Sequence, residues 1–317
     1  MKIVVLDGHV ANPGDLSWDS LASLGELTVY PRTAPGEVLE RCAGATAVFT
    51  NKVVLDSAII ASLPDLKFIG VLATGYNNVD TAAAAQAGIA VCNVPAYSSD
   101  SVAQTVFSLL LEITNRTGEY SSEVRSGRWS SCPDFSFTLG PITELAGLTM
   151  GIYGLGNIGR RVAAIASAFG MNVVSPTSQE AAALPPYVTK VNFDEFLAMT
   201  DVKSLNAPLT ASNRGKFNAE TFARMKRGVI FINTARGPLV DEAALADALR
   251  SGQVGAAGLD VLGQEPPASD NPLLTAPHCY ITPHIAWQST AARRRLLAVS
   301  ASNLAAFISG RPQNKVN

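Results

Sequence analysis

The fold of half of this chain is decided by Met150-Gly-Ile-Tyr-Gly-Leu-Gly-Asn-Ile-Gly159, a glycine-rich stretch near the middle of the sequence. Its apolar start predicts a buried strand, and the Ala-rich pattern of 160–169 predicts a helix. Between them, Gly154 permits a tight turn, Gly156 lets a pyrophosphate approach the backbone, and Gly159 allows close packing of the helix on the strand. The first N–H groups of the helix can then bind phosphate. The pattern predicts a dinucleotide site, and an ordinary glycine-rich turn is the competing interpretation.

The composition is that of a globular protein with room for two domains. The chain has 317 residues, 47% of them hydrophobic, and a formal net charge of −2. Lys and Arg are scattered, so we expect no nucleic-acid partner, and the one basic cluster, Arg293-Arg294-Arg295, is expected to be a solvated helix face. No apolar run approaches the ~20 residues that span a bilayer, and the N-terminus reads as a strand and a turn, so we expect no membrane partner.

The cysteines indicate a reducing environment. Four cysteines occur without a C-x-x-C pair and without a spacing to the three histidines that would suit a metal. We therefore expect no metal site, no structural disulfide and a cytoplasmic location.

Strand-like and helix-like segments alternate along both halves of the chain, which predicts two parallel sheets with helices on both faces. Two helical patterns, at about 102–113 and 289–308, flank the half that carries the glycine stretch. A polar loop is expected after the first of them. The expected strands are 2–6, 27–30, 47–50, 66–72 and 90–93 in the first half, and 150–153, 171–174, 188–191, 202–206, 229–233, 256–260 and 279–282 in the second.

This organisation predicts an α/β fold with two doubly wound parallel-sheet domains. A Rossmann nucleotide domain, residues 100–285, would be inserted into a flavodoxin-like substrate domain, residues 1–99 plus 286–317. The two flanking helices would form a hinge, and a ligand would be enclosed between the domains.

Three polar residues follow strands of the second half, where doubly wound sheets bind ligands. They are Arg236, Glu265 and His284. Each alone is more often a carbonyl cap, a solvated side chain or a structural residue, but together they suit hydride transfer to or from a carbonyl. A histidine can move the alcohol proton, a carboxylate would fix its tautomer and favour the imidazolium, and an arginine can bind a carboxylate and polarise the carbonyl. No G-x-S-x-G sequence supports a serine hydrolase.

Over essentially its full length the chain resembles the D-isomer-specific 2-hydroxyacid dehydrogenases. The resemblance implies that Arg236 binds and orients a 2-oxo acid, that His284 is the acid–base and that Glu265 is its partner. It also implies a homodimer formed through the nucleotide domains. The matching stretches are Gly154 to Gly159, Asn233-Thr-Ala-Arg-Gly-Pro-Leu-Val240, Gly258-Leu-Asp-Val261 with Glu265-Pro-Pro267, and Pro283-His-Ile-Ala286.

Further positions match the family. Leu72-Ala-Thr-Gly-Tyr-Asn77 resembles the loop that binds the substrate carboxylate, which implies that the N–H groups of Thr74 and Gly75 hold it; a plain strand-to-helix turn is the alternative. Asp260 matches a residue that contacts the nicotinamide amide, and Asn206-Ala-Pro208 a loop along the cofactor. The predicted cofactor contacts are Gly154, Gly156, Asn157, Ile158, Gly159, Thr177, Asn206, Ala207, Pro208, Thr234, Ala235, Arg236, Asp260, His284 and Ala286.

The ribose end of this site departs from the usual NAD pattern. An acid about 20 residues after the glycines normally bonds the ribose 2′-hydroxyl, but here Thr177 stands at that place. Thr177 and Ser178 could bond a 2′-phosphate, although no adjacent arginine neutralises it and Glu180 would oppose it. We therefore expect NADP or NAD as cofactor, with NADPH slightly favoured.

The sequence thus predicts an NAD(P)-dependent D-2-hydroxyacid dehydrogenase that reduces small 2-oxo acids to 2-hydroxy acids. Within the family it is most similar to the glycerate dehydrogenases and hydroxypyruvate reductases, so hydroxypyruvate and glyoxylate are the expected substrates. A dehydrogenase of D-lactate, a phosphorylated hydroxy acid or formate is an alternative; the lack of a basic phosphate cluster disfavours the second and Glu265 the third. A non-catalytic nucleotide sensor, similar to the corepressors of the family, is another.

Overall fold

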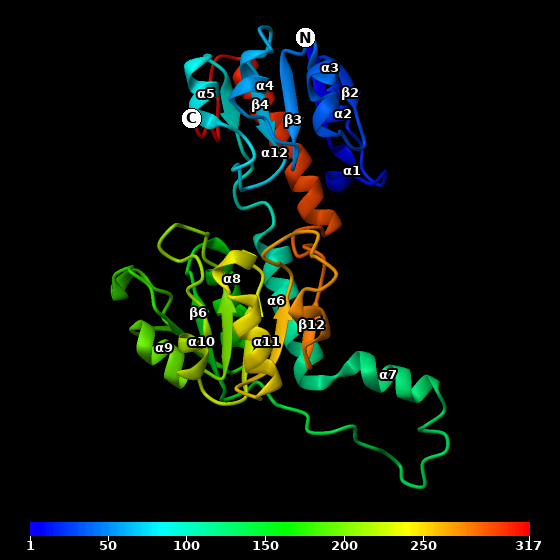
Figure 1. Ribbon diagram of the computed structural model, residues 1–317, viewed down its shortest axis with the longest axis vertical. Helices are drawn as coiled ribbons and strands as arrows, with labels where there is room; N and C mark the ends of the chain where they lie inside the picture. Colours follow the sequence, from blue (N-terminus) through cyan, green and yellow to red (C-terminus); the bar gives the residue numbers. More distant parts are fainter. The chain divides into compact units, whose positions relative to one another are not determined.

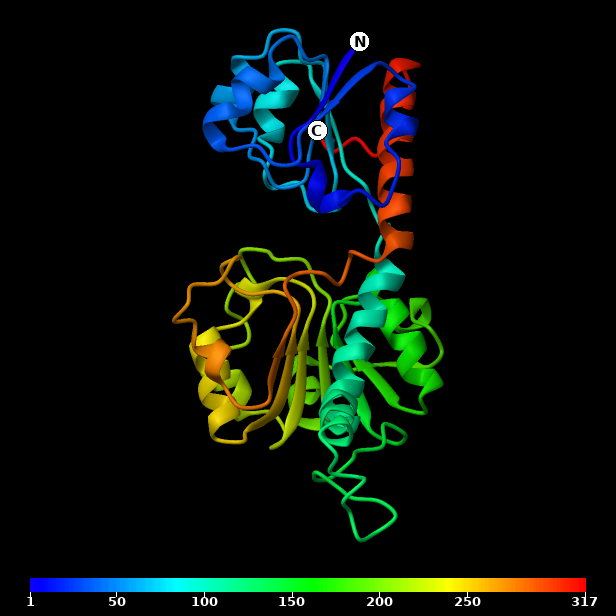
Figure 2. The ribbon, with the colours of Figure 1, turned by 90° about the vertical axis from the view of Figure 1, so that its right-hand side faces the viewer.

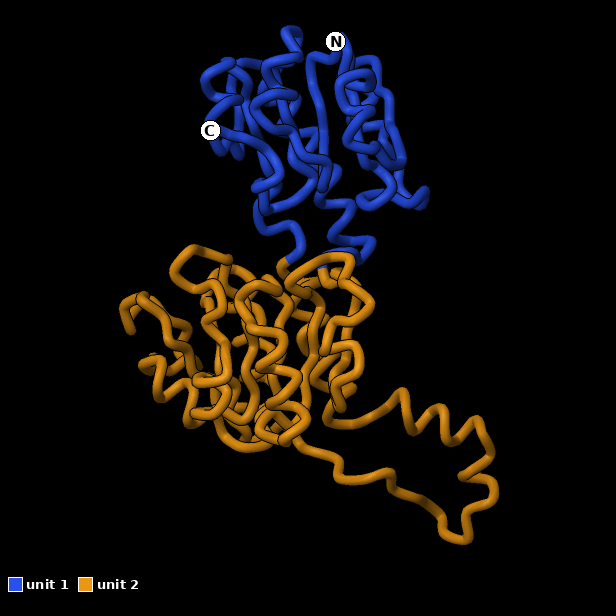
Figure 3. Tube along the Cα trace, viewed as in Figure 1, with its two compact units in different colours: residues 1–98, 287–317 blue, residues 99–286 orange.

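The computed structural model describes residues 1–317, which divide into two units. Unit 1 comprises Met1–Ser98 and Trp287–Asn317, and unit 2 comprises Ser99–Ala286. The second unit is therefore inserted between the two segments of the first, as the two colours of Figure 3 show. Each unit contains one sheet, and every strand pairing in both sheets is parallel.

The sheet of unit 1 has the order β2-β1-β3-β4-β5, which is the flavodoxin-like order. Because successive side chains of a strand point to opposite faces, Ile3 and Val5 pack on one side of this sheet and Val4 on the other. Figure 2 shows α12 on one side and the small helices α3, α4 and α5 on the other. The elements are β1 (Lys2–Val5), α1 (Gly8–Ala11), α2 (Asp19–Ala22), β2 (Glu26–Val29), η1 (Pro35–Glu37), α3 (Val38–Cys42), β3 (Ala47–Thr50), α4 (Ser57–Ala61), β4 (Phe68–Val71), α5 (Thr81–Gln86), β5 (Ala90–Cys92) and α12 (Thr290–Ile308).

The sheet of unit 2 has the order β12-β11-β10-β9-β6-β7-β8. Its buried side chains again divide between two faces: Ile232 packs with side chains of α6 and α8, and Phe231 packs with side chains of α9, α10 and α11. The elements are α6 (Ser99–Asn115), α7 (Thr117–Arg125), β6 (Thr149–Tyr153), α8 (Asn157–Ala168), β7 (Asn172–Ser175), η2 (Ala181–Ala183), β8 (Val188–Lys190), α9 (Phe193–Met199), β9 (Val202–Leu205), α10 (Ala219–Ala223), β10 (Val229–Asn233), η3 (Gly237–Leu239), α11 (Glu242–Arg250), β11 (Val254–Leu259), η4 (Pro272–Thr275) and β12 (Cys279–Ile281).

The predicted fold class is confirmed, since all twelve expected strands are present and form two parallel sheets. One predicted loop is wrong in part: the polar segment after α6 begins with the helix α7, which buries no residue. A helix without an apolar stripe leaves no periodic signal in a sequence. The basic cluster is also wrong in part, because Arg293 is buried and pairs with Asp15 at 2.6 Å.

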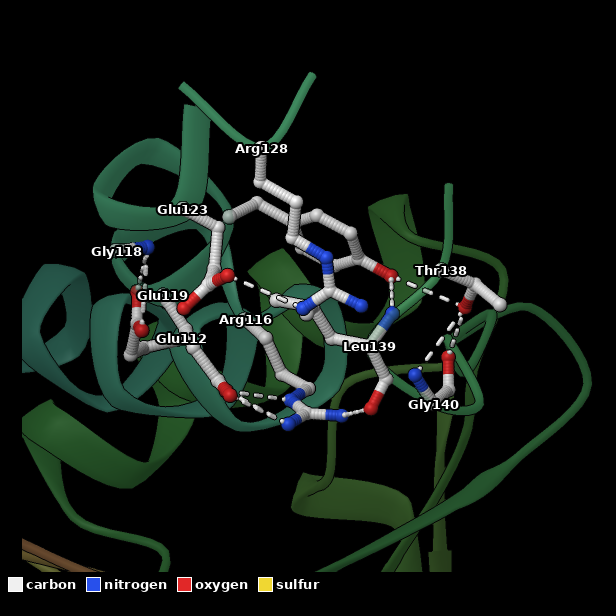
Figure 4. Close-up of polar contacts among 10 residues, drawn as sticks. Glu112, Arg116, Gly118, Glu119, Glu123, Arg128, Thr138, Leu139 and Gly140 are labelled. Atoms are coloured by element: carbon white, nitrogen blue, oxygen red, sulfur yellow. Dashed lines mark hydrogen bonds and ion pairs between the residues drawn. The ribbon is translucent and has the colours of Figure 1, made fainter. Parts of the chain in front are cut away.

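The segment from α7 to residue 140 extends away from the rest of unit 2 as an arm (Figure 1). Polar contacts hold the two sides of this arm together (Figure 4). Arg116 pairs with Glu119 at 2.7 Å and donates to the carbonyl of Leu139 at 2.6 Å, and the Tyr120 hydroxyl accepts from the N–H of Leu139 at 2.9 Å. The arm thus has a defined internal structure.

None of the helices combines the length and the apolar character that crossing a membrane requires. No group of three or more His, Cys, Asp or Glu side chains is arranged to hold a metal ion. All four cysteines are free thiols.

Candidate active site

The glycine stretch forms the turn between β6 and α8, and at two of its positions a side chain would clash with the backbone. Gly154 has a φ of +98°, and a Cβ there would lie 2.5 Å from the N atom of Ala207. A Cβ on Gly159 would lie 2.1 Å from the carbonyl oxygen of Gly154. Around Gly156, in contrast, no heavy atom lies within 4 Å of the Cβ position. The turn is therefore tight where the chain folds on itself and open where a pyrophosphate would lie.

The same close approach brings the predicted cofactor loop Asn206-Ala207-Pro208 beside the glycine turn. No side chain caps the N-terminus of α8, so its first N–H groups have no side-chain acceptor. The start of α8 is thus available for an anion.

Two buried polar atoms along this edge of the sheet have no hydrogen-bond partner in the protein. They are Oδ1 of Asn206, which follows β9, and Oγ1 of Thr234, which follows the adjacent strand β10. A buried polar atom without a partner costs about 1–3 kcal/mol, so such atoms call for a ligand. Together with the open space at Gly156, they show that the residues present fit a dinucleotide cofactor.

Arg236 lies in the turn after β10, and Asn233 shapes this turn. The Asn233 side chain donates to the carbonyl of Arg236 at 3.0 Å and accepts from the N–H of Ala235 at 3.0 Å. The Arg236 side chain is exposed, forms no ion pair, and donates only to the carbonyl of Ala235, at 2.7 Å. Its guanidinium is therefore free to bind a carboxylate.

A glycine joins this turn to the loop after β11. A Cβ on Gly237 would lie 1.9 Å from the carbonyl carbon of Leu262, so no other residue fits without moving the backbone. The N–H of Leu262 donates to Oε1 of Glu265 at 3.0 Å. The turn of Arg236 and the loop of Glu265 thus pack directly against each other.

Glu265 and His284 form the predicted pair. Oε2 of Glu265 lies 2.6 Å from Nδ1 of His284, and about a third of each side chain is exposed. With Nδ1 held by the carboxylate, Nε2 is the ring nitrogen left for a substrate.

Asp260 holds the loop that carries His284. Its buried carboxylate accepts from the Thr282 hydroxyl at 2.6 Å and from the N–H groups of Ile285 and Ala286, each at 2.9 Å. Burial raises the pKa of Asp260, and these hydrogen bonds act in the opposite direction. His284 itself has a φ of +55°, which is uncommon outside glycine. Asp260 therefore stabilises a loop conformation that is costly for a histidine.

The predicted carboxylate loop lies in unit 1, after β4. The side-chain hydroxyl of Thr74 donates to the carbonyl of Val94 at 2.8 Å, and the Asn93 side chain donates to the carbonyl of Thr74 at 2.7 Å. The N–H groups of Thr74 and Gly75 donate to no group of the chain. They are available for an anion, as a carboxylate loop requires.

Thr177 and Ser178 lie in the turn after β7 and border a hollow of about 610 Å³. Lys190 and Lys216 border the same hollow. The sequence shows no cation adjacent to Thr177, because these lysines are remote from it along the chain. The sequence carries no signal for Lys190, because only the order of the folded sheet places β8 beside β7.

All the predicted catalytic residues, and the cofactor residues, thus follow strands of unit 2 at the carboxyl edge of one sheet, while Thr74 and Gly75 belong to unit 1.

Comparisons with known proteins identify one family. The family model described as "D-isomer specific 2-hydroxyacid dehydrogenase, NAD binding domain" matches residues 107–286. A hydroxypyruvate reductase of Blautia hydrogenotrophica is 46% identical over all of both chains, and a glycerate dehydrogenase of Methylorubrum extorquens is 40% identical over 92% of each. The solved structure of an acyclic imino acid reductase in complex with NADPH and D-Arg superimposes with a TM-score of 0.85, at 27% identity over all of both chains.

Proposed function

Since this chain belongs to the D-isomer-specific 2-hydroxyacid dehydrogenase family, we propose that it reduces hydroxypyruvate, and the smaller glyoxylate, to D-2-hydroxy acids with NAD(P)H. The same site would catalyse the reverse oxidation. The observation that carries the proposal is the 2.6 Å contact between His284 and Glu265, on loops that pack beside an unpaired Arg236.

Arg236 binds the 2-oxo acid. A guanidinium presents several donors in one plane, so it can hold the substrate carboxylate and polarise the neighbouring carbonyl without losing its own proton. The exposed and unpaired state of Arg236 supports this role. In the reverse direction the same contacts would hold the hydroxy acid.

His284 supplies the proton. When bound, NAD(P)H would supply a hydride to C2 of the 2-oxo acid, and negative charge would then develop on the carbonyl oxygen. The Nε2–H of the imidazolium donates to this oxygen, and the proton passes to it to form the hydroxyl. Glu265 holds Nδ1, which orients the ring and stabilises its charged form.

The cofactor residues follow from the open turn and the unpaired atoms. The N–H groups at the start of α8, beside Gly156, would bind the pyrophosphate. The unpaired atoms of Asn206 and Thr234 would find partners on the cofactor. Asp260, whose carboxylate has a further acceptor position, would contact the nicotinamide amide while holding the His284 loop.

Thr74 and Gly75 would bind the carboxylate of the 2-oxo acid through their unpaired N–H groups. Asn93 supports this role, because its side chain fixes the carbonyl of Thr74 and so the direction of the loop.

The enzyme would act as a homodimer formed through unit 2. The arm from α7 onward carries exposed apolar side chains, with Phe135 91% exposed and Trp129 51% exposed. Side chains of this type are enriched at protein interfaces. The four free cysteines support a reducing, cytoplasmic setting.

A screen of 2-oxo acids with NADPH and NADH tests the proposed function. We expect the absorbance of the reduced cofactor at 340 nm to fall with hydroxypyruvate and glyoxylate, and kcat to fall by orders of magnitude in His284→Gln while cofactor binding persists. Absence of oxidation with every acid would refute the reductase and favour a nucleotide sensor. Preferential turnover of pyruvate would favour a D-lactate dehydrogenase, and near-normal turnover by His284→Gln would refute the role of the histidine.

The same measurements compare the two cofactors. We propose that the enzyme uses both NADPH and NADH, with NADPH slightly favoured, because no acid follows β7 at the place of Thr177. A strong preference for NADH in kcat/KM would refute this.

A further inference from the structure

We propose that unit 2 contains a phosphate-binding site beyond the carboxyl end of β7, and that this site receives the 2′-phosphate of NADPH. It is formed by Thr177 and Ser178 together with Lys190, Arg160 and Lys216. The inference rests on the proposed cofactor site and assigns the residues of its ribose end.

Sheet register brings the first cation to the turn. Lys190 is the last residue of β8 and pairs directly with Ser175, the last residue of β7. Its ammonium lies 2.8 Å from the carbonyl of Gln179, so it reaches the turn that carries Thr177 and Ser178. The same hollow of about 610 Å³ is bordered by both hydroxyl residues and by Lys190. Hydroxyls and an ammonium therefore meet in one open space.

Helix α8 supplies the second cation. The Arg160 guanidinium donates to the side-chain carbonyl of Gln179 and to the backbone carbonyl of Ala183, the latter at 3.2 Å. Gln179 in turn donates to the carbonyl of Leu155 in the glycine turn at 3.0 Å. The turn after β7 is thus tied to the glycine turn, where the pyrophosphate would bind, and the phosphate site lies at the ribose end of the same cofactor.

None of the three cations has a carboxylate partner. Lys190 and Arg160 donate to carbonyl groups, and the ammonium of Lys216 lies 4.3 Å from the centre of the Phe193 ring. The adjacent residue Arg161 is different, because it pairs with Asp100 at 2.7 Å. Positive charges without carboxylate partners, placed beside the hydroxyl groups of one turn, are the elements of a phosphate site.

The acids near the hollow do not cancel this charge. Glu195 borders the hollow, but one of its oxygens accepts the N–H of Asn192 at the start of α9, at 2.8 Å. Glu180 follows the turn and precedes η2, and it does not border the hollow. Three cations against two acids leave the region positive, which favours a dianionic phosphate over a neutral hydroxyl.

Binding of two adenosine fragments tests the site without any catalysis. Adenosine 2′,5′-bisphosphate carries the 2′-phosphate, and 5′-AMP is the matched ligand without it. We expect isothermal titration calorimetry to show the bisphosphate binding at least tenfold more tightly to the wild-type protein. Lys190→Gln and Arg160→Gln should each weaken the bisphosphate about tenfold and leave 5′-AMP unchanged. Arg161→Gln is the control, since it removes the same charge one residue along α8 and should change neither affinity.

Other outcomes would overturn the proposal. Equal affinity of the wild type for the two fragments would do so, as would an equal loss in all three variants. Displacement of the bisphosphate by inorganic phosphate at similar concentration would indicate a general anion site instead. If Arg160→Gln lowers the melting temperature, Lys190→Gln decides the test. Tight bisphosphate binding by a protein that reduces no 2-oxo acid would leave this site standing and refute the proposed function.

Discussion

Replacement of Glu265 by Gln tests whether the carboxylate takes part in catalysis by stabilising charged His284, or only holds its own loop in place. The contact with Nδ1 of His284 is 2.6 Å long, and Oε1 also accepts the N–H of Leu262 at 3.0 Å. A Gln side chain has the same shape and can still accept from Leu262, but it has no charge to stabilise the imidazolium. A hydrogen bond to a charged group contributes about 1.5–3 kcal/mol. Because about 1.4 kcal/mol is a tenfold change in rate, we expect kcat to fall between about 10-fold and 150-fold.

The matched control is Glu242→Gln. Glu242 belongs to α11 and accepts from the N–H of Gly263 at 2.6 Å and from the Asn271 side chain at 2.8 Å, so it holds the same loop without contacting the histidine. Steady-state kinetics with hydroxypyruvate and a saturating cofactor give kcat, and circular dichroism gives the melting temperature. An unchanged kcat in Glu265→Gln would refute the assignment of Glu265. An equal fall of kcat in both variants would show that catalysis depends on the conformation of the loop and not on the charge of Glu265.

Three other substitutions test further side chains. Asp260→Asn replaces a carboxylate that accepts two loop N–H groups with an amide that has only one acceptor oxygen. We therefore expect the free energy of unfolding by urea to fall by about 1–3 kcal/mol, and kcat to fall as well. Unchanged values would contradict the role of this carboxylate in holding the His284 loop. Thr177→Asp places a negative charge in the proposed 2′-phosphate site, so the ratio of kcat/KM for NADPH to that for NADH should fall at least tenfold, and an unchanged ratio would remove Thr177 from the site. Burial lowers the pKa of Lys203 from 10.5 to about 7. Between these pH values the unfolded chain binds a proton that the folded chain does not. The contribution of Lys203 to the free energy of unfolding therefore rises with pH, by up to about 1.4 kcal/mol per pH unit. Urea titrations between pH 7 and pH 10 should therefore show that the free energy of unfolding rises less with pH in Lys203→Met than in the wild type. An identical pH dependence in the two proteins would refute the lowered pKa of Lys203.

Much of the fold is evident in the residues alone because its signals are local. Short apolar runs separated by helical patterns predict every strand, and the glycine spacing after residue 153 predicts the turn that Gly154 and Gly159 form. The helix α7 gives no such signal, since its side chains are all outside the core. The burial of Arg293 could not be predicted from its charged cluster either, because Arg293 pairs with Asp15, which is far away in the sequence.

The candidate site, like the fold, could be predicted from the sequence only in part. Arg236, Glu265 and His284 are identified by their places after strands, since parallel strands deliver the residues that follow them to one edge of a sheet. The order β12-β11-β10, which brings these three residues to neighbouring strands, exists only in the folded sheet.

The sequence could establish what depends on neighbours along the chain: the glycine turn, the absence of an acid at Thr177, and the types of residue that end each strand. Only the tertiary structure could show that Lys190 and Arg160 converge on that turn from another strand and from a helix, and that Asp260 holds the loop of His284. The physical reason is that such contacts depend on strand order, register and side-chain reach, which are set when the sheet assembles and not by the spacing of residues in the sequence.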